Sequence, residues 1–328
     1  RAVPLSLPLL VIAFLTIFVT CELSSLDRLC ASRFRTLNQK RMVVVTGYWN
    51  VAGAQSEGVK HTHEHYVRQS QTTAQMLAEQ KVPVVYFSED FSMCDVFSKS
   101  YSEVRHTRTD MVQCRQLSYN DLPYRNETSV IGQVCDKKWP EKHSKERSTL
   151  QVGMLRKLSR MWLSKLHLML QAGDNFQSMV VWMDVGLSPK LLRHVFSQIS
   201  SGNFRWPEGS IAVASRMSWN TYAHLLNSPN PNILPKNLSK GDFFGDKRCT
   251  GTLLRGGTII AQSEDLARFI PEYNDFLARK AEAIRGNPNI CPCFDEESVL
   301  SEIMVSSQLG ETLYPQPIFS DLKIPSCP

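Results

Sequence analysis

An aspartate closes a short apolar segment near the middle of the chain. Residues 179–183 (Met-Val-Val-Trp-Met) predict a strand buried on both faces, and Asp184, Val185 and Gly186 follow it directly. In an open α/β sheet the ligand crevice lies beyond the carboxyl ends of the strands, so we expect Asp184 to point into it. A carboxylate there suits Mg²⁺ or Mn²⁺ bridging a diphosphate. The alternative, that Asp184 caps the next helix, is weaker because Ser188 before a proline is the better cap.

Other charged residues could act at the same crevice. Lys165 lies three residues after Trp162, on the apolar stripe of its predicted helix. It either extends past the edge of the core to reach water or offers its ammonium to a phosphate. Asp295, Glu296 and Glu297 open the last predicted helix, where the helix dipole favours acids and Asp295 would cap. One of these acids could instead act as a general base toward an acceptor hydroxyl, or as a second metal ligand.

The sequence lacks the motifs of several enzyme classes. It has no G-x-S-x-G elbow, Walker A loop, H-E-x-x-H or G-x-G-x-x-G, which argues against serine hydrolases, P-loop enzymes, zincins and dinucleotide oxidoreductases. His61, His63 and His65 alternate along the chain, and this spacing indicates a solvated polar stretch rather than a metal site. A hydrolase would need two carboxylates facing one another across a cleft, a pair that the sequence does not identify.

A sheet is needed to position these residues, and the apolar pattern predicts one. Residues 42–47, 63–79 and 82–87 predict a strand, a helix and a strand, which together form a βαβ unit. Residues 90–147 lack clear periodicity and are interpreted as a partly helical insertion. The remaining predictions are helices at 150–170, 263–284 and from 295, and strands at 179–183, 210–214 and 252–261. Together they predict one α/β domain, residues 42–328, on a mainly parallel sheet.

Composition narrows the class of protein further. The chain has 328 residues, of which 42% are hydrophobic and 21% charged, so disorder, collagen-like repeats and a multi-span membrane protein are excluded. The formal net charge of +6 suits a phosphate-bearing ligand. No block of lysine and arginine is dense enough for a DNA-binding arm, and we expect no nucleic-acid partner.

The first residues predict a membrane anchor. Residues 2–20 carry no charge and are long enough to cross a hydrocarbon core of ~30 Å as a helix. We therefore expect a transmembrane signal-anchor at residues 1–23 and a basic stem at residues 24–41. A cleaved signal peptide is the main alternative.

The orientation of this anchor is indicated by opposing features. Basic residues after the apolar segment favour the cytosolic side, whereas the sequons at Asn126 and Asn237 and nine cysteines favour an oxidising lumen. The number of cysteines is odd and Cys21 is the natural one to stay unpaired, but the pairing of the others is open. We expect a type II, single-pass membrane glycoprotein with disulfides in the lumen of the Golgi or endoplasmic reticulum.

Five segments, in this order, resemble the HtrL/YibB-like proteins, a family assigned to the GT-A type of glycosyltransferase. They are residues 43–49 (VVVTGYW), 83–88 (PVVYFS), 162–166 (WLSKL), 181–186 (VWMDVG) and 294–300 (FDEESVL). The resemblance spans residues 42–305, and its most specific part is the Trp-x-Asp-x-Gly signature.

This resemblance implies a GT-A-like domain that transfers sugar from a nucleotide-sugar donor to a glycan or glycoprotein acceptor. It places Asp184 at the metal-binding aspartate motif, with Mn²⁺ or Mg²⁺ as the expected ion. The other implied site residues are Thr46, Tyr48, Lys165 and Trp182 for donor binding and Asp295 and Glu296 for catalysis. Many GT-A enzymes carry two aspartates around one residue, whereas this chain has only Asp184. Metal-independent binding, and a catalytically inactive relative that binds glycans or a partner, therefore stay open as alternatives.

Overall fold

The structure is a computed structural model that describes part of the chain. The described residues are 34–36, 42–50, 63–104, 109–134, 152–173, 179–200, 205–215, 254–286, 296–306 and 312–317. The predicted anchor at residues 1–23, the second sequon at Asn237 and the predicted catalytic residue Asp295 lie outside these ranges. In the described ranges, no helix combines the length and the apolar character that a membrane span requires.

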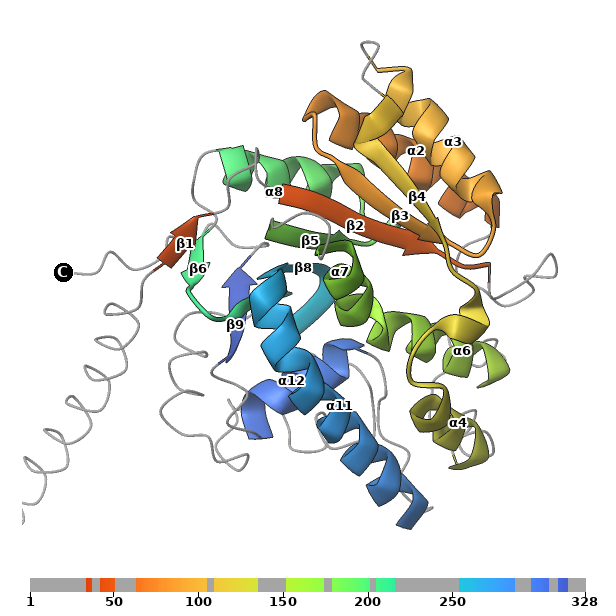
Figure 1. Cartoon of the computed structure of the whole chain (residues 1–328), viewed down its shortest axis with the longest axis vertical. Helices are drawn as coiled ribbons and strands as arrows, with labels where there is room; N and C mark the ends of the chain where they lie inside the picture. Colours follow the sequence, from red (N-terminus) through yellow and green to blue (C-terminus); the bar gives the residue numbers. More distant parts are fainter. Residues whose placement is uncertain are drawn as a thin grey trace, which may run out of the picture.

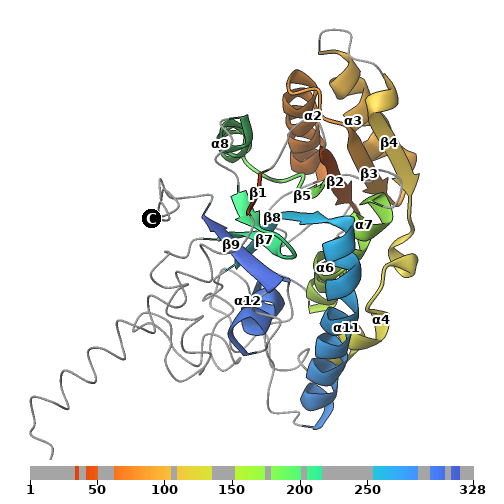
Figure 2. The same ribbon diagram turned by 60° about the vertical axis from the view of Figure 1, so that its left-hand side comes forward.

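A seven-stranded sheet forms the centre of the molecule, with the strand order β4-β3-β2-β5-β8-β7-β9 (Figures 1 and 2). Its strands are β2 (Met42–Tyr48), β3 (Val84–Ser88), β4 (Val112–Gln116), β5 (Met179–Met183), β7 (Ile211–Ser215), β8 (Leu254–Gln262) and β9 (Leu313–Pro317). β8 pairs antiparallel with both neighbours, and the other pairs are parallel. The predicted α/β class and mainly parallel sheet are therefore confirmed.

The central strands owe their place to uninterrupted apolar sequence. All five residues of β5 are buried, and Val43, Val44 and Val45 of β2 are fully buried. Because side chains alternate between the two faces of a strand, such runs fit positions covered by helices on both sides. The β2–β5 register places Val45 opposite Trp182, and the β2–β3 register places Thr46 opposite Tyr86. Trp182 and Thr46 therefore lie on opposite faces of the sheet.

Helices cover both faces of the sheet (Figures 1 and 2). They are α2 (His63–Glu79), α3 (Phe91–Ser102), α4 (Arg125–Val134), α6 (Val152–Leu163), α7 (Lys165–Gly173), α8 (Pro189–Ser200), α11 (Ser263–Gly286) and α12 (Glu296–Ser306). α2 and α3 pack on one side with α8 beside α2, while α7 and α11 lie on the other side and α12 packs against β8. The predicted bounds of α2 are confirmed.

The helix predicted at residues 150–170 is two helices in the structure. α6 ends at Leu163 and α7 begins at Lys165, with Ser164 between them. The Ser164 hydroxyl donates to the carbonyl of Arg160 at 2.6 Å, a local side-chain bond of the kind that bends helices. The break matters for the site because it makes Lys165 the first residue of a new helix.

The interpretation of residues 90–147 as an insertion is wrong for its first part. α3 and β4 form a second crossover, and β4 adds a parallel strand at the edge of the sheet. Cys94 of α3 and Cys114 of β4 form a disulfide across this unit, with Cα atoms 5.9 Å apart. Short 3₁₀ turns flank β4, one before it at Thr109–Met111 and one after it at Tyr119–Asp121.

Two other predictions meet unexpected local structure. Part of the predicted stem forms β1 (Phe34–Thr36), which pairs antiparallel with β6 (Arg205–Pro207). The first sequon, at Asn126, lies in the first turn of α4. Asn126 is exposed there, whereas Thr128 is buried and its hydroxyl donates to the carbonyl of Tyr124 at 2.6 Å.

Candidate functional site

The order of the strands defines where a ligand crevice belongs. The chain runs from β2 through β3 to β4 on one side, and then returns to place β5 on the other side of β2. Ligands of open α/β sheets bind at such a switch point, outside the carboxyl ends of the strands. Tyr48 is the last residue of β2 and Asp184 directly follows β5, so both lie at this edge.

Asp184 is held at the end of β5 by its backbone and by its neighbour. Its backbone N–H donates to the carbonyl of Gly257 in β8 at 3.0 Å, which extends the ladder by one residue. Trp182 Nε1 donates to Asp184 Oδ1 at 2.6 Å. The carboxylate stays 36% exposed, so one side of it faces solvent while the other is fixed by the protein.

Lys165 is buried and fully bonded. Its ammonium lies 2.9 Å from Oδ1 and 3.2 Å from Oδ2 of Asp184, donates to the carbonyl of Gly256 at 3.0 Å, and forms an ion pair with Glu296. The side chain is 3% exposed. An ammonium has three donors, and these acceptors use all of them. The geometry therefore does not favour the prediction that Lys165 offers its charge to a phosphate.

The charge of Lys165 is secured by its partners. Burial alone would lower the pKa of this lysine, but the carboxylates of Asp184 and Glu296 offset burial and raise its pKa above the ordinary value. One ammonium faces two carboxylates, and the cluster carries a net formal charge of −1. This excess negative charge lies at the carboxyl edge of the sheet, where the Asp184 side chain is partly exposed.

Glu296 completes the cluster from α12, the helix that packs against β8. It is the first residue of α12 and is only 6% exposed. Gly256 leaves room for it, because a Cβ at this position would lie 2.7 Å from Glu296 Cδ and closer still to Cγ. The carboxylate is thus packed against β8 and tied to Lys165, and is not presented to an acceptor hydroxyl.

A second group of side chains lies at the same edge on the α2 face. The Tyr48 hydroxyl is 3.0 Å from His63 Nδ1, and its ring centroid is 5.3 Å from that of Tyr66. Tyr66 also approaches the turn after Asp184, since a Cβ on Gly186 would lie 3.6 Å from its ring. Burial, and then the nearby Tyr66 and Asp90, raise the pKa of Tyr48 to about 12. The pKa of Tyr66 is raised as well, so both phenols are neutral hydrogen-bonding groups.

Tyr66 is electrostatically linked to the first cluster. Burial raises the pKa of Tyr66, and the Asp184 carboxylate raises it further. Sequence reasoning missed Tyr66 and the contact of His63 with Tyr48, although His63 is exposed, as the predicted solvated stretch requires. The available signal was their position in the first turns of a helix that follows β2, since this places them at the carboxyl edge of the sheet.

The structure brings four of the predicted site residues together and separates the others. Lys165, Trp182, Asp184 and Glu296 form one cluster. Tyr48 lies at the same edge on the opposite face. Thr46 is fully buried inside β2 under α2, so its placement does not favour contact with a donor.

A divalent metal ion fits this site only through Asp184. Across the described ranges, no group of three or more histidine, cysteine, aspartate or glutamate side chains is arranged to hold a metal. Mg²⁺, however, is commonly bound by one or two carboxylates together with the phosphates of its substrate. Asp184 is exposed enough to supply that single carboxylate, and so the residues present fit an ion that arrives with a diphosphate.

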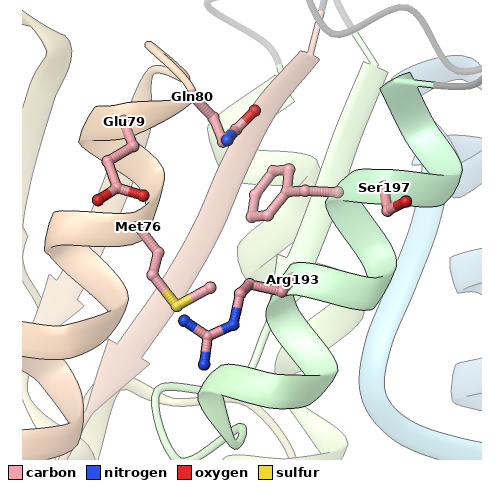
Figure 3. A pocket seen from close by; sticks show the side chains of 6 residues that line it. Met76, Glu79, Gln80, Arg193 and Ser197 are labelled. Atoms are coloured by element: carbon pink, nitrogen blue, oxygen red, sulfur yellow. The ribbon is translucent and has the colours of Figure 1, made fainter.

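A hollow between α2 and α8 lies away from this cluster (Figure 3). It has a volume of about 330 Å³ and is lined by Met76, Glu79, Gln80, Arg193, Phe196 and Ser197. Its α2 residues are at the last turn of that helix, which leads into the amino end of β3. Asp184 lies at the carboxyl end of the parallel strand β5, so the hollow is at the opposite edge of the sheet and is no part of the candidate site.

Comparisons with known proteins complete the description. No protein-family model matches the chain, and no curated protein matches it either. Among solved structures, the apo form of mouse xyloside xylosyltransferase 1 is similar over 84% of each chain, with 11% sequence identity and a TM-score of 0.42. A likeness this weak carries no functional argument, and the HtrL/YibB resemblance stays a prediction.

Proposed function

We propose that the chain is a glycosyltransferase that binds the diphosphate of a nucleotide sugar at Asp184 and transfers the sugar to a glycan or glycoprotein. The observation that carries this proposal is the half-exposed Asp184 carboxylate at the switch point of the sheet, held from behind by Trp182 and Lys165. A fixed carboxylate at this position is suited to a ligand that brings phosphates and a cation together.

The charge of the cluster supports a metal-dependent donor site. Because Lys165, Asp184 and Glu296 together carry a net charge of −1, a bare diphosphate would be repelled from the exposed carboxylate. When bound, Mg²⁺ or Mn²⁺ would supply the positive charge that stabilises the departing diphosphate. Asp184 would hold that ion, while the neutral phenols of Tyr48 and Tyr66 would bind oxygen atoms of the donor.

The placement of Glu296 supports two other conclusions. A hydrolase would need two carboxylates across a cleft, but Asp184 and Glu296 converge on a buried ammonium. The same ion pair favours the catalytically inactive relative as a second candidate, since it withdraws Glu296 from proton transfer. Release of free nucleoside diphosphate in the presence of glycan acceptors separates the candidates, because an inactive relative binds the donor or the glycan without turnover.

We also propose a lumenal location, as a type II membrane protein of the secretory pathway. The Cys94–Cys114 disulfide supports this proposal because such bonds persist in oxidising compartments. The measurement is the recovery of the two cysteines as one linked peptide from non-reduced protein made in cells. Two free thiols there would contradict a lumenal domain.

The donor site is tested by binding. The purified full chain is screened against common uridine and guanosine diphosphate sugars with Mn²⁺, and one of them should raise the melting temperature. A ligand at one hundred times its Kd stabilises by about 2.7 kcal/mol, which is readily seen. The same donor in a chelator should give a much smaller shift.

The variant Asp184→Asn tests whether nucleotide-sugar binding depends on the Asp184 carboxylate. The variant keeps the shape of the side chain but removes the charge that holds a cation, so the Mn²⁺-dependent shift should be lost while the fold is kept. Asp95→Asn is the matched control, because Asp95 is exposed on α3. If no nucleotide sugar shifts the melting temperature of the wild-type chain, or if Asp184→Asn binds as the wild type does, the proposed donor site is wrong.

A further inference from the structure

We infer that Trp182, Lys165 and Glu296 form a positioning frame for Asp184, that none of the three contacts the donor, and that the Asp184 carboxylate is the protein group that binds the divalent cation. This inference rests on the proposed function, whose donor it leaves unspecified. It assigns to Trp182, Lys165 and Glu296 a role different from the donor binding and catalysis that the family resemblance implies.

Trp182 is placed to orient a carboxylate and not to bind a ligand. It is 4% exposed and lies two residues before Asp184, so both side chains are on the same side of the strand. Its single N–H is used at 2.6 Å by Asp184 Oδ1. One face of its ring is occupied as well, because the Lys165 ammonium lies 5.7 Å from the ring centroid.

Lys165 and Glu296 hold the Asp184 carboxylate from the side of α7 and α12. The three donors of the ammonium reach Asp184, the Gly256 carbonyl and Glu296, so the lysine joins α7 to β5, β8 and α12. Glu296 is held in turn by the space above Gly256. Removal of either charge would leave the other buried without its partner, which is costly in a protein interior.

Both carboxylate oxygens of Asp184 are held by the frame. Oδ1 accepts a hydrogen bond from Trp182 at 2.6 Å, and the Lys165 ammonium lies 2.9 Å from it. Oδ2 accepts a hydrogen bond from Lys165 at 3.2 Å. The side chain is still 36% exposed, so the carboxylate offers a cation a protein ligand of fixed orientation.

The test measures Mn²⁺ affinity of the full chain by the electron paramagnetic resonance signal of free Mn²⁺, alone and with uridine diphosphate. Trp182→Phe keeps a ring in the core but removes the N–H. Loss of a hydrogen bond that orients a metal ligand typically weakens metal binding 10- to 100-fold, and we expect a loss in this range. Trp162→Phe is the matched control, because Trp162 is half-buried on α6 and should leave Mn²⁺ affinity unchanged.

Glu296→Gln separates positioning from catalysis. Gln can still accept a bond from Lys165 but lacks the charge, so a positioning role predicts a several-fold loss of Mn²⁺ affinity. A catalytic base would instead lose turnover while Mn²⁺ affinity stays the same. Far-ultraviolet circular dichroism verifies that each variant is folded before its affinity is compared.

The outcomes distinguish this inference from the proposed function. Equal Mn²⁺ affinity in the wild type and Trp182→Phe, unchanged affinity in Glu296→Gln, or no Mn²⁺ binding by the wild type under either condition would overturn the frame. If Mn²⁺ binds and both variants weaken it, while no nucleotide sugar binds, the frame stands and the proposed function fails.

Discussion

At the candidate site the ammonium of Lys165 is enclosed by two carboxylates and a carbonyl, with 3% of its side chain exposed. Such a cluster is stable only while every member keeps its partner, because desolvation of a charge costs several kcal/mol and the ion pair must offset it. The stability of the cluster therefore depends on residues that carry no charge. Gly256 is the clearest example, since it provides both the carbonyl for Lys165 and the space for Glu296.

Gly256→Ala should disrupt the cluster without removing any of its charged groups. The new Cβ would lie 2.7 Å from Glu296 Cδ, so the carboxylate must move away from Lys165. Breaking a buried pair costs 3–5 kcal/mol when one partner is removed, and partial relaxation here reduces the expected loss to about 2–4 kcal/mol. Urea unfolding measures the change in the free energy of unfolding.

The matched control for this substitution is Gly286→Ala. A Cβ on Gly286, at the end of α11, meets no atom within 4 Å. It should be neutral or stabilise by up to about 1 kcal/mol, since alanine favours the helix. If both alanine variants unfold at the same urea concentration, Gly256 is not required for the position of Glu296.

The sequence predicted individual residues of the cluster better than their contacts. Asp184 and Glu296 were identified because each is placed by its own element, one after a buried strand and the other at the start of a helix. The bonds of Lys165 could not be predicted, because they depend on the helix break at Ser164 and on the close approach of β8. Tyr66 was missed because its approach to the turn after Asp184 depends on the return of β5 beside β2.

At the scale of elements, prediction succeeded where apolar sequence is continuous and failed at the edge of the sheet. β5 was predicted to the residue, since Met179–Met183 is buried on both faces. β4, with the sequence VQCRQ, has no such pattern because the edge strand is partly exposed. The disulfide from Cys94 to Cys114 compensates for this weak apolar character by attaching β4 to the helix that precedes it.

Removal of this disulfide should lower the stability of the chain. The two cysteines are 20 residues apart, and closing a loop of about this length in the unfolded chain is worth about 3 kcal/mol. Cys94→Ala combined with Cys114→Ala should therefore lower the free energy of unfolding by about this amount. A decrease in the urea midpoint relative to the wild type is the measurement.

Reduction provides the internal control for the double variant. A strong thiol reductant should destabilise the wild-type chain, and much of the difference from the double variant should then disappear. A difference of the same size with and without reductant would mean that packing of the Cys94 and Cys114 side chains, and not the covalent link, stabilises the unit.

At the scale of the whole molecule, the core contains many phenols whose ionisation is opposed by burial. Burial is the leading cause in each case, and the tyrosines with raised pKa values are Tyr48, Tyr66, Tyr86, Tyr101 and Tyr124. They come from β2, α2, β3, α3 and the segment before α4, so they are spread over the α2 side of the sheet and the start of α4. Because these phenols are buried in the same core, their ionisation at high pH should accompany the unfolding of that core.

This distribution predicts a loss of stability in alkaline solution. Burial raises the pKa of Tyr48 and Tyr101 from 10.0 to about 12, so between these values the folded chain retains protons that the unfolded chain has released. Stability then falls as the pH rises through this window. The raised pKa of Lys165 acts in the same direction, because the contribution of its ammonium is complete below the ordinary value of 10.5 and is lost as the pH rises above it.

In an alkaline titration the near-ultraviolet absorbance of these phenolates should appear together with the loss of far-ultraviolet circular dichroism, whereas in guanidinium the phenols should ionise near pH 10. If the five tyrosines ionised near pH 10 while the circular dichroism was retained, they would be accessible to water, and the packing of α2 and α3 against the sheet would be looser than the structure shows.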